Sequence, residues 1–586
     1  MMYRFGPRLD REGVTFRLWA PAARTVDLVC GETLTMRKGA DGWFELAVPR
    51  ARPGLRYGFR IDGELDVPDP ASAFQPDDVS GQSQVVDHGY DWQATDWRGR
   101  PWHETVILET HVGTFTPAGT FRAMIEKLDH LVATGVTALE LMPLADFPGR
   151  RNWGYDGVLL YAPGSAYGTP DDLKALVDAA HGRGLMVFLD VVYNHFGPEG
   201  NYLGRYAPSF FSTKAHTPWG AAVDYGIAEV RAFAIENALH WLDRYRFDGL
   251  RLDAVHAIGL PGEPHILTAL SRAVGDLAER SGRLIHLVLE NDDNTAWLLD
   301  PPANPPQGKY RAQWNDDYHH AWHTFLTREA RGYYKDYQGD EARHLPRMLA
   351  SGFAYQGETS RHRDGRARGE ASEHLPPTAF VSFLQNHDQI GNRARGERLD
   401  VLAAPERIEA ALAVTLLAPF PPLMFQGEEW GSTQAFPFFC DFAGDLAEAV
   451  RRGRKAEFAE DYAHQADNGA IPDPLADKTF GDAVLDWSAQ ERAPHKGRLD
   501  LVRRLLAVRR AEVVPRLAGV AGGGARSAMT DGILTASWPL SGGTLHLMAN
   551  LSDAPKPGKS LPGRPIWGPP LRDQVQPWSV HWSWQG

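Results

Sequence analysis

The sequence predicts an α/β protein built as a (β/α)8 TIM barrel, flanked by an N-terminal β-sandwich and a small C-terminal β domain. Three observations predict it. Apolar strand-like runs alternate with amphipathic helices over residues 98–517, short alternating strands precede them in residues 1–97, and a hairpin pattern follows in residues 518–586. A bare barrel needs about 250 residues, so this chain of 586 residues leaves room for long insertions.

The N-terminal region shows a period of two in segments 14–19, 43–48 and 56–61, with Gly and Pro turns between them. This pattern is typical of a small β-sandwich. A passage rich in Pro and Asp, residues 67–72, follows, and from near Val106 apolar strand-like runs alternate with amphipathic helices instead. We therefore expect a domain boundary near residue 98.

Helix signals support the barrel. Thr169 stands at an N-cap position, Pro170 at the first helical position, and Gly184 at a point where the helix can stop. The next run, residues 185–192, is apolar on both faces apart from Asp190, as expected of a parallel strand buried on both sides. Similar runs predict strands at residues 106–109, 138–142, 185–190, 247–253, 284–290, 380–386 and 422–427, with an eighth around 312–315.

The last part of the chain predicts a closing helix and a small β domain. Residues 499–517 are rich in Leu and Arg and would complete the barrel as a helix. Residues 533–538 and 544–549 then alternate about the turn Ser541-Gly542-Gly543, which predicts a hairpin.

The composition excludes some classes of partner. Lys and Arg number 61 against 74 Asp and Glu, a net charge of −13 that would repel phosphate backbones and anionic lipid. No run approaches the ~18 apolar residues of a membrane span, and the N-terminus lacks the apolar core of a signal peptide, so we expect a cytoplasmic protein. The two cysteines, Cys30 and Cys440, have no neighbouring Cys or His at zinc-ligand spacing and are expected to be buried thiols.

Polar residues at the ends of the predicted strands are the catalytic candidates, because the loops at that end build the site of a barrel. In residues 247–253 the strand period puts Arg251 and Asp253 on one face. A guanidinium there would keep the Asp253 carboxylate ionised, which suits a nucleophile. Taken alone, a structural ion pair is an equally good interpretation.

Two further strands end in acids, Glu290 and Asp388. Burial and neighbouring negative charge should raise the pKa of Glu290, so that it stays protonated and acts as a general acid. One carboxylate to attack and one acid to protonate is what retaining glycoside cleavage requires, with the two carboxyls about 5 to 5.5 Å apart.

At its strand ends the chain resembles the α-amylase clan of glycoside hydrolases, in residues 190–195, 249–253, 289–292 and 385–388. The resemblance implies that Asp253 is the nucleophile, Glu290 the acid/base and Asp388 a third carboxylate that grips the sugar at subsite −1. It also implies five further residues of that subsite, with the first as a stacking platform: Tyr155, Asp190, His195, Arg251 and His387.

Within the clan, the amino-acid sequence around these motifs is most similar to that of the maltooligosyltrehalose trehalohydrolase family. The similar stretches are residues 111–116, 145–150, 194–198, 217–220, 313–317 and 427–430. The resemblance implies hydrolysis of the α-1,4 bond next to a terminal trehalose, beside a synthase that makes that end. Thr110 and Ala73 depart from the family pattern but do not touch the acids. Candidate residues for subsites +1 and +2 are His256, Asn291, Asp292 and Trp219.

No cofactor is expected. The segment 316–320 (DDYHH) with His323 contains types of metal ligand, but no second cluster accompanies it, and a polar loop over a sugar cleft explains the same residues. By resemblance, the chain belongs with the calcium-free branch of the clan.

Three alternatives stay open at this point. A branching or debranching enzyme would share the chemistry at subsite −1 and differ in the acceptor or the bond. A catalytically silent glucan-binding scaffold would be expected to lack at least one of the three acids, and all three are present. A nucleic-acid or nucleotide protein is disfavoured by the acidic charge and the lack of a phosphate loop.

Overall fold

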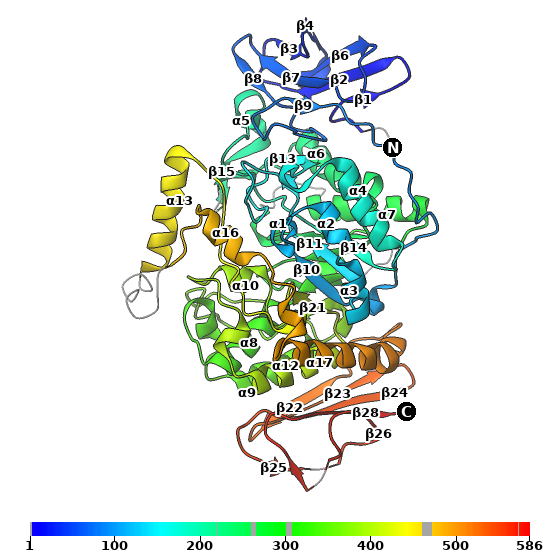
Figure 1. Ribbon diagram of the computed structural model, residues 1–586, viewed down its shortest axis with the longest axis vertical. Coiled ribbons are helices and arrows are strands. Elements are labelled where there is room, and N and C mark those ends of the chain that lie inside the picture. The colour runs from blue at the N-terminus through cyan, green and yellow to red at the C-terminus, as the bar shows by residue number, and fades with distance from the viewer. Residues whose placement is uncertain are drawn as a thin grey trace.

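Three units are stacked along the long axis of the molecule (Figure 1), with the N-terminal β domain at one end, the barrel in the middle and the C-terminal β domain at the other end. The structure is a computed structural model. It describes residues 3–217, 220–258, 265–300, 307–459, 471–558, 560–571 and 573–586. The predicted fold class is confirmed, and the domain boundaries at residues 97 and 517 stay predictions.

The N-terminal domain is a sandwich of two antiparallel sheets, in the orders β1-β2-β6-β5 and β4-β3-β7-β8, with β9 paired to β7. Inward-facing side chains such as Phe16, Leu28 and Phe59 are buried between the sheets. The strands are β1 Arg8–Leu9, β2 Gly13–Trp19, β3 Val26–Val29, β4 Thr33–Thr35, β5 Arg37–Lys38, β6 Trp43–Pro49, β7 Arg56–Ile61, β8 Leu65–Val67 and β9 Ser83–Gln84.

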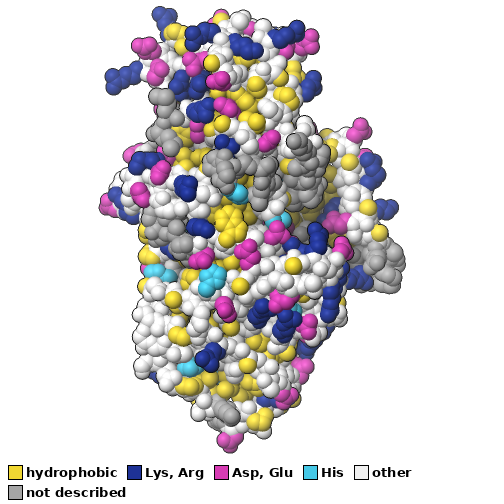
Figure 2. Space-filling model, turned by 180° about the vertical axis from the view of Figure 1, so that it is seen from behind, with side chains coloured by type: hydrophobic (Ala, Val, Ile, Leu, Met, Phe, Trp, Pro, Cys, Tyr) yellow, Lys and Arg dark blue, Asp and Glu magenta, His cyan; other side chains and the backbone are white. Residues whose placement is uncertain are grey.

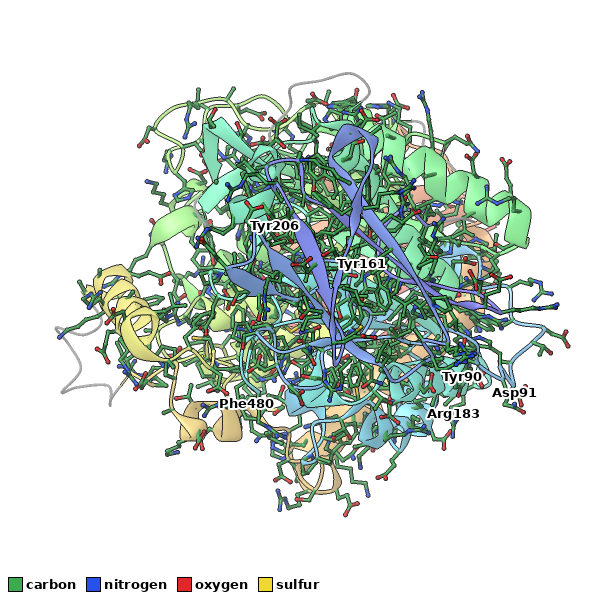
Figure 3. All side chains as sticks on the ribbon, turned by 90° about the horizontal axis from the view of Figure 1, so that it is seen from above. Tyr90, Asp91, Tyr161, Arg183, Tyr206 and Phe480 are labelled. Carbon is green, nitrogen blue, oxygen red and sulfur yellow. The ribbon has the colours of Figure 1, made fainter. Side chains whose placement is uncertain are left out.

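This domain packs directly on the barrel. The rings of Phe5 and Phe233 lie 5.1 Å apart, and the Ala22 amide donates to the Tyr206 carbonyl at 3.0 Å. Figure 3, seen from above, shows Tyr206 of α5 and Tyr161 of β13 near the centre of the view, where the strands of the sandwich overlie the barrel. The two units therefore share a continuous apolar core.

Eight parallel strands close into a barrel in the chain order, and all eight predicted strands are confirmed to within a few residues at their ends. Trp102 fills the bottom of the barrel, where its indole N–H donates to the Thr378 carbonyl at 2.7 Å. Because the strands are parallel, their carboxyl ends all meet at the other end. The strands are β10 Ile107–Thr110, β11 Ala138–Leu141, β14 Met186–Val191, β17 Gly249–Leu252, β18 His286–Leu289, β19 Ala312–Trp314, β20 Phe380–Phe383 and β21 Pro422–Phe425.

Helices and short hairpins follow these strands. The hairpin strands are β12 Ala145–Asp146, β13 Leu159–Pro163, β15 Phe211–Thr217 and β16 Gly220–Val223. The helices are α1 Val112–Phe115, α2 Phe121–Ile125, α3 Leu128–Thr134, α4 Pro170–His181, α5 Leu203–Tyr206, α6 Ala228–Leu239, α7 Ile266–Ser281, α8 Asp316–Thr327, α9 Glu341–Ser351, α10 His387–Gly391, α11 Leu399–Leu402, α12 Pro405–Leu417, α13 Gly444–Glu457, α16 Asp477–Ala483 and α17 His495–Val508.

Two helix predictions can be compared with the structure in detail. Thr169 caps α4 in a reciprocal capping box with Asp172, as its sequence position predicts. Gly184 ends this helix as predicted: α4 runs to His181, and beyond it Gly184, with φ of +75°, donates its N–H to the His181 carbonyl at 2.9 Å while Leu185 donates to the Ala180 carbonyl at 3.0 Å. The predicted helix over residues 499–517 begins earlier, at His495, and beyond Val508 it continues as a wider and then a tighter turn up to Arg516.

The C-terminal domain is a five-stranded antiparallel sheet in the order β22-β23-β24-β28-β26, with a separate β25-β27 pair. The predicted hairpin is confirmed as β23 and β24. The sheet packs on barrel helices, since the Trp538 indole donates to the Leu349 carbonyl of α9 and the Trp582 indole to the Ala413 carbonyl of α12. The strands are β22 Arg526–Thr530, β23 Ile533–Leu540, β24 Gly543–Asn550, β25 Lys556–Pro557, β26 Arg564–Trp567, β27 Gln574–Val575 and β28 Val580–Gln585.

Within the described residues, no helix has both the length and the apolar character needed to cross a bilayer.

Candidate active site

A cleft of about 490 Å³ opens at the carboxyl ends of the barrel strands, beside α13. Figure 2 shows histidine, acidic and hydrophobic side chains gathered at mid-height on one face of the molecule, between α13 at the right and the grey atoms. Acidic, imidazole and aromatic side chains dominate the lining of the cleft. It includes Trp153, Tyr155, His195, Asp253, His256, Glu290, Asp292, Asp316, His320, Tyr333, His362, His387, Asp388, Gln389, Asn392, Phe438, Arg454 and Glu457.

Asp253 directly follows β17, and its backbone amide donates to the Val191 carbonyl of β14 at 3.0 Å. Its two carboxylate oxygens accept separate hydrogen bonds, from Arg251 at 2.8 Å and from the Asn194 amide at 2.9 Å. Burial raises the pKa of Asp253, but Arg251, the Asn194 amide and His195 outweigh burial and leave this pKa below its ordinary value. The carboxylate is therefore held ionised and oriented.

Glu290 follows β18 on the neighbouring strand. Its Oε2 accepts the backbone N–H of Ala254 at 2.7 Å and lies 3.0 Å from the Arg251 guanidinium. Ala254 reaches this position with a left-handed backbone, φ +39° and ψ 50°, which is unusual for a residue other than glycine. Burial raises the pKa of Glu290 well above its ordinary value; Arg251 opposes this rise, and Asp253, Asp316 and Asp388 add to it.

Arg251 connects the acids from below. It is 1% exposed, and its Nη1 donates to both Asp253 and Asp190, the latter at 2.7 Å. Its guanidinium also stacks 4.1 Å from the centre of the Trp314 ring. Burial raises the pKa of Asp190 to about 6, against the opposing effect of Arg251. Asp190 and Arg251 therefore support the cleft from beneath and do not line it.

Asp388 lies in the first turn of α10, and a cap explains its position. The Asn386 side chain accepts hydrogen bonds from the backbone N–H groups of Asp388 and Gln389, and the Gln389 side chain accepts one from the backbone N–H of Asn386 in return. The preceding His387 stacks on Tyr155, with ring centres 5.1 Å apart and planes 22° apart. This short capped helix holds both side chains at the cleft.

Tyr155 and His195 are tied to the same cluster. The Tyr155 hydroxyl donates to Asp190 at 2.6 Å, and His195 Nε2 lies 2.9 Å from the Tyr155 carbonyl oxygen. Burial lowers the pKa of His195. The predicted residues of subsite −1 thus form one connected group.

Only some of the residues predicted for the + subsites line the cleft. His256 and Asp292 line the cleft, and the Asp292 amide lies 3.3 Å from His256 Nδ1. Asn291 does not line it, because its side chain is buried and bonds Thr295. Trp219 lies outside the described residues.

Sequence reasoning missed two functional candidates, Glu109 and Tyr333, whereas Asp316 belongs to the segment expected as a polar loop over the cleft and lies instead at the start of helix α8. Asp316 and Tyr333 line the cleft, and burial together with Asp292 and Asp388 raises the pKa of Asp316 to about 7. Glu109 lies beneath, on β10, and contacts His387. A charged residue inside an apolar strand is the anomaly that drew attention to Asp190, and the same signal was available for Glu109.

The segment considered as a metal site serves other contacts. Asp317 forms a buried ion pair with Arg368 and accepts the backbone amides of Ala354 and Tyr355. His319 contacts the Tyr334 hydroxyl at 2.9 Å. Within the part of the chain that the structure describes, no group of three or more His, Cys, Asp and Glu side chains could hold a metal ion.

Comparisons with known proteins agree with this geometry. The family model described as the α-amylase catalytic domain matches residues 95–217, and that of carbohydrate-binding module 48 (isoamylase N-terminal domain) matches residues 4–73. The malto-oligosyltrehalose trehalohydrolase of Deinococcus radiodurans is 44% identical over 505 residues, 86% of this chain and 82% of that protein. The protein of the same name from Saccharolobus solfataricus is 40% identical over 495 residues, 83% of this chain and 84% of that protein.

Among solved structures, a putative α-amylase from Salmonella typhimurium is 44% identical, has a TM-score of 0.95 and covers 100% of both chains. The fold, the acids at the strand ends and these matches define a glycosidase of the α-amylase class. Within that class, the chain belongs to the malto-oligosyltrehalose trehalohydrolase family. The resemblance noted from the sequence is confirmed.

Proposed function

We propose that the protein hydrolyses the α-1,4-glucosidic bond next to the terminal trehalose of maltooligosyltrehalose, with retention, and releases trehalose and a maltooligosaccharide. One observation carries the proposal. The buried Arg251 contacts both Asp253 and Glu290, in a chain 44% identical to a protein named for this substrate. The opposite pKa shifts of the two acids suit the two roles that a retaining glycosidase requires.

In the first step, the Asp253 carboxylate attacks the anomeric carbon while Glu290 gives its proton to the glycosidic oxygen. The C–O bond to trehalose breaks, trehalose leaves, and a glycosyl ester forms on Asp253. In the second step, Glu290, now a carboxylate, takes a proton from water, and the water oxygen attacks the same carbon and releases Asp253. The 2.7 Å bond from the Ala254 amide favours the ionised form of Glu290 that exists between the steps.

The remaining groups bind the sugar in this proposal. Asp388 accepts hydrogen bonds from hydroxyl groups of the sugar ring at subsite −1, while Tyr155 presents an aromatic face to the C–H surface of that ring. Asp190, His195, Arg251 and His387 complete that subsite, with Asp190 and Arg251 acting through Tyr155 and Asp253.

For the trehalose side we propose His256 and Asp292, which lie on the cleft, with Asn291 supporting the turn behind them. Asp292 is fixed by Arg368, which donates to its carbonyl at 2.8 Å and to its carboxylate at 3.0 Å. A rigid acceptor at this point suits a disaccharide rich in hydroxyl groups.

The substrate implies a functional partner. A trehalosyl end on an α-glucan must be made by a separate isomerising synthase, and we propose that the two enzymes work together in the cytoplasm.

The test is to incubate the purified protein with maltotriosyltrehalose and, in parallel, with maltopentaose and amylose, and to identify products by chromatography. We expect free trehalose and maltotriose, with little attack on the plain glucans. New α-1,6 branches from amylose would replace the proposal with a branching enzyme. No product from any substrate would support a glucan-binding scaffold.

A further inference from the structure

A second groove lies far from the cleft, between the C-terminal sheet and helices α12 and α17, which adjoin one another at the lower end of Figure 1. Its volume is about 640 Å³, within the range of about 300–1,000 Å³ usual for ligand pockets. Its lining includes Trp567 and Trp578 from the sheet domain, Glu406 and Glu409 from α12, and Arg504 from α17.

The two tryptophans form the apolar part of the groove. Both are half-buried, so each ring is partly covered by protein and partly open. Arg504 lies 5.7 Å from the Trp567 ring centre and Arg407 lies 5.0 Å from that of Trp578. These cation–π contacts help to fix the rings in place before any ligand arrives.

Hydrogen bonds and an unusual backbone conformation fix Trp578. Its indole N–H donates to Asp553 at 2.7 Å, and Asp553 also accepts from Arg407 at 3.1 Å. Its backbone φ is +50°, a conformation that bulky residues avoid. A costly backbone conformation that fixes a half-open indole is typical of binding sites.

The polar part of the groove consists mainly of hydrogen-bond acceptors. Glu406 and Glu409 are exposed on one face of α12, and the Ser579 residue lines the groove near them. Two carboxylates and one arginine, Arg504, which already contacts Trp567 and the Asp500 carbonyl, disfavour an anionic ligand, and the chain as a whole carries a net charge of −13. Aromatic faces beside acceptors suit a neutral ring with an apolar C–H face and hydroxyl groups at its edge.

We propose that this groove is a second carbohydrate site, which binds a linear α-1,4-glucan segment by stacking on Trp567 and Trp578 and by hydroxyl hydrogen bonds to Glu406. The inference goes beyond the proposed function, because it concerns binding away from the catalytic cleft. A glucan chain is also the polymer that a protein of this function meets. The groove would hold such a chain on the enzyme independently of the acids.

The test uses the full-length Glu290→Gln protein, so that glucan is not consumed, and measures its retardation in native gels containing amylose. The variants are Trp567→Ala and Glu406→Ala, each in that background. Glu406 is exposed on a helix, so its change to alanine preserves the fold. Trp92→Ala is the matched control, because Trp92 is also half-buried and stacked by an arginine, at 4.4 Å from Arg246, but lies outside the groove.

We expect the apparent dissociation constant for amylose to rise at least fivefold in the two groove variants and to stay unchanged in Trp92→Ala. Turnover of maltotriosyltrehalose should be unaltered when the groove changes are made in the protein with intact acids. Unchanged retardation in both groove variants would overturn the proposal. A failure of the proposed function would instead appear as absent trehalose release with retardation intact, so the two failures are distinguishable.

Discussion

Glu109 and His387 form a buried pair at the floor of the cleft. The Glu109 carboxylate contacts His387 Nδ1 through one oxygen and accepts the backbone N–H of His387 at 3.0 Å through the other. Burial lowers the pKa of His387, but Glu109 outweighs it and leaves this pKa above its ordinary value. Glu109 therefore favours the protonated form of the imidazole that stacks on Tyr155, and its two contacts fix the orientation of the ring.

Glu109→Gln should remove the charge that keeps His387 protonated. We expect kcat/KM to fall about tenfold or more, and the loss to grow as the pH rises, because a neutral His387 no longer donates from both nitrogens. The pH dependence of kcat/KM checks this. Glu104→Gln, a change in a partly exposed acid of the preceding turn, is the control; equal pH profiles for all three proteins would contradict the role.

Replacing either central acid should lower turnover by orders of magnitude without unfolding the protein. Glu290→Gln removes acid catalysis, which is worth about 10²–10⁴-fold, and Asp253→Ala removes the nucleophile and should cost several orders of magnitude. Trehalose release and circular dichroism measure the two properties. Full activity in either variant would refute the assignment of the acids.

The pH profile should be a bell with widely separated limbs. In the proposed mechanism Asp253 acts ionised, and its pKa is lowered, whereas Glu290 acts protonated, and its pKa is raised. Hence kcat/KM should fall at low pH as Asp253 gains a proton and at high pH as Glu290 loses one. The two limbs belong to the interacting pair. Residual activity of Glu290→Gln should lack the alkaline limb, and its persistence there would assign that limb to another group.

Glu140 offers a test of stability. This β11 side chain is 1% exposed, neither carboxyl oxygen has a hydrogen-bond partner, and burial, together with Glu109 and Asp190, raises its pKa well above the ordinary value of 4.5. The folded state then holds a proton that the unfolded chain releases, so stability is lost as the pH rises from about that value through the folded pKa.

Glu140→Gln removes this titration. We therefore expect the midpoint of thermal unfolding to fall less between pH 5 and pH 8 in the variant than in the unmodified protein. Differential scanning calorimetry at the two pH values gives the comparison, with Glu64→Gln as an exposed control. An identical pH dependence in all three proteins would count against the burial argument.

Gly391 should tolerate no side chain. A Cβ there would lie 1.9 Å from the Trp153 indole, which lines the cleft, and Gly391 ends the helix that carries Asp388. We expect Gly391→Ala to lower stability by about 1–3 kcal/mol, as overpacking does, and to reduce kcat. Gly453→Ala in α13, where a Cβ meets nothing within 4 Å, is the matched control. Equal melting curves and rates for both would contradict the prediction.

The barrel was predictable because each of its strands is an apolar run between helix signals, and the acids because they interrupt or end such runs. The supporting residues were harder to find. Asp316 lies in the cleft through the packing of α8 against its neighbours, and α13 supplies Arg454 and Glu457 from far along the chain. Contacts of that kind depend on tertiary packing, which leaves no local period in the sequence.

The peptide unit that joins Asp253 to Ala254 itself donates to Glu290, and Arg251 ties the same two acids from below. The main chain of adjacent strands thus sets the spacing of the two acids, whereas His256 and Asp292, the residues proposed for the trehalose side, lie beyond the strand ends. In the proposed function, selectivity and chemistry are therefore carried by separate parts of the chain. Exchange of the segments that carry His256 and Asp292 is then expected to change which sugar is accepted and to leave the contacts between Asp253, Glu290 and Arg251 unchanged.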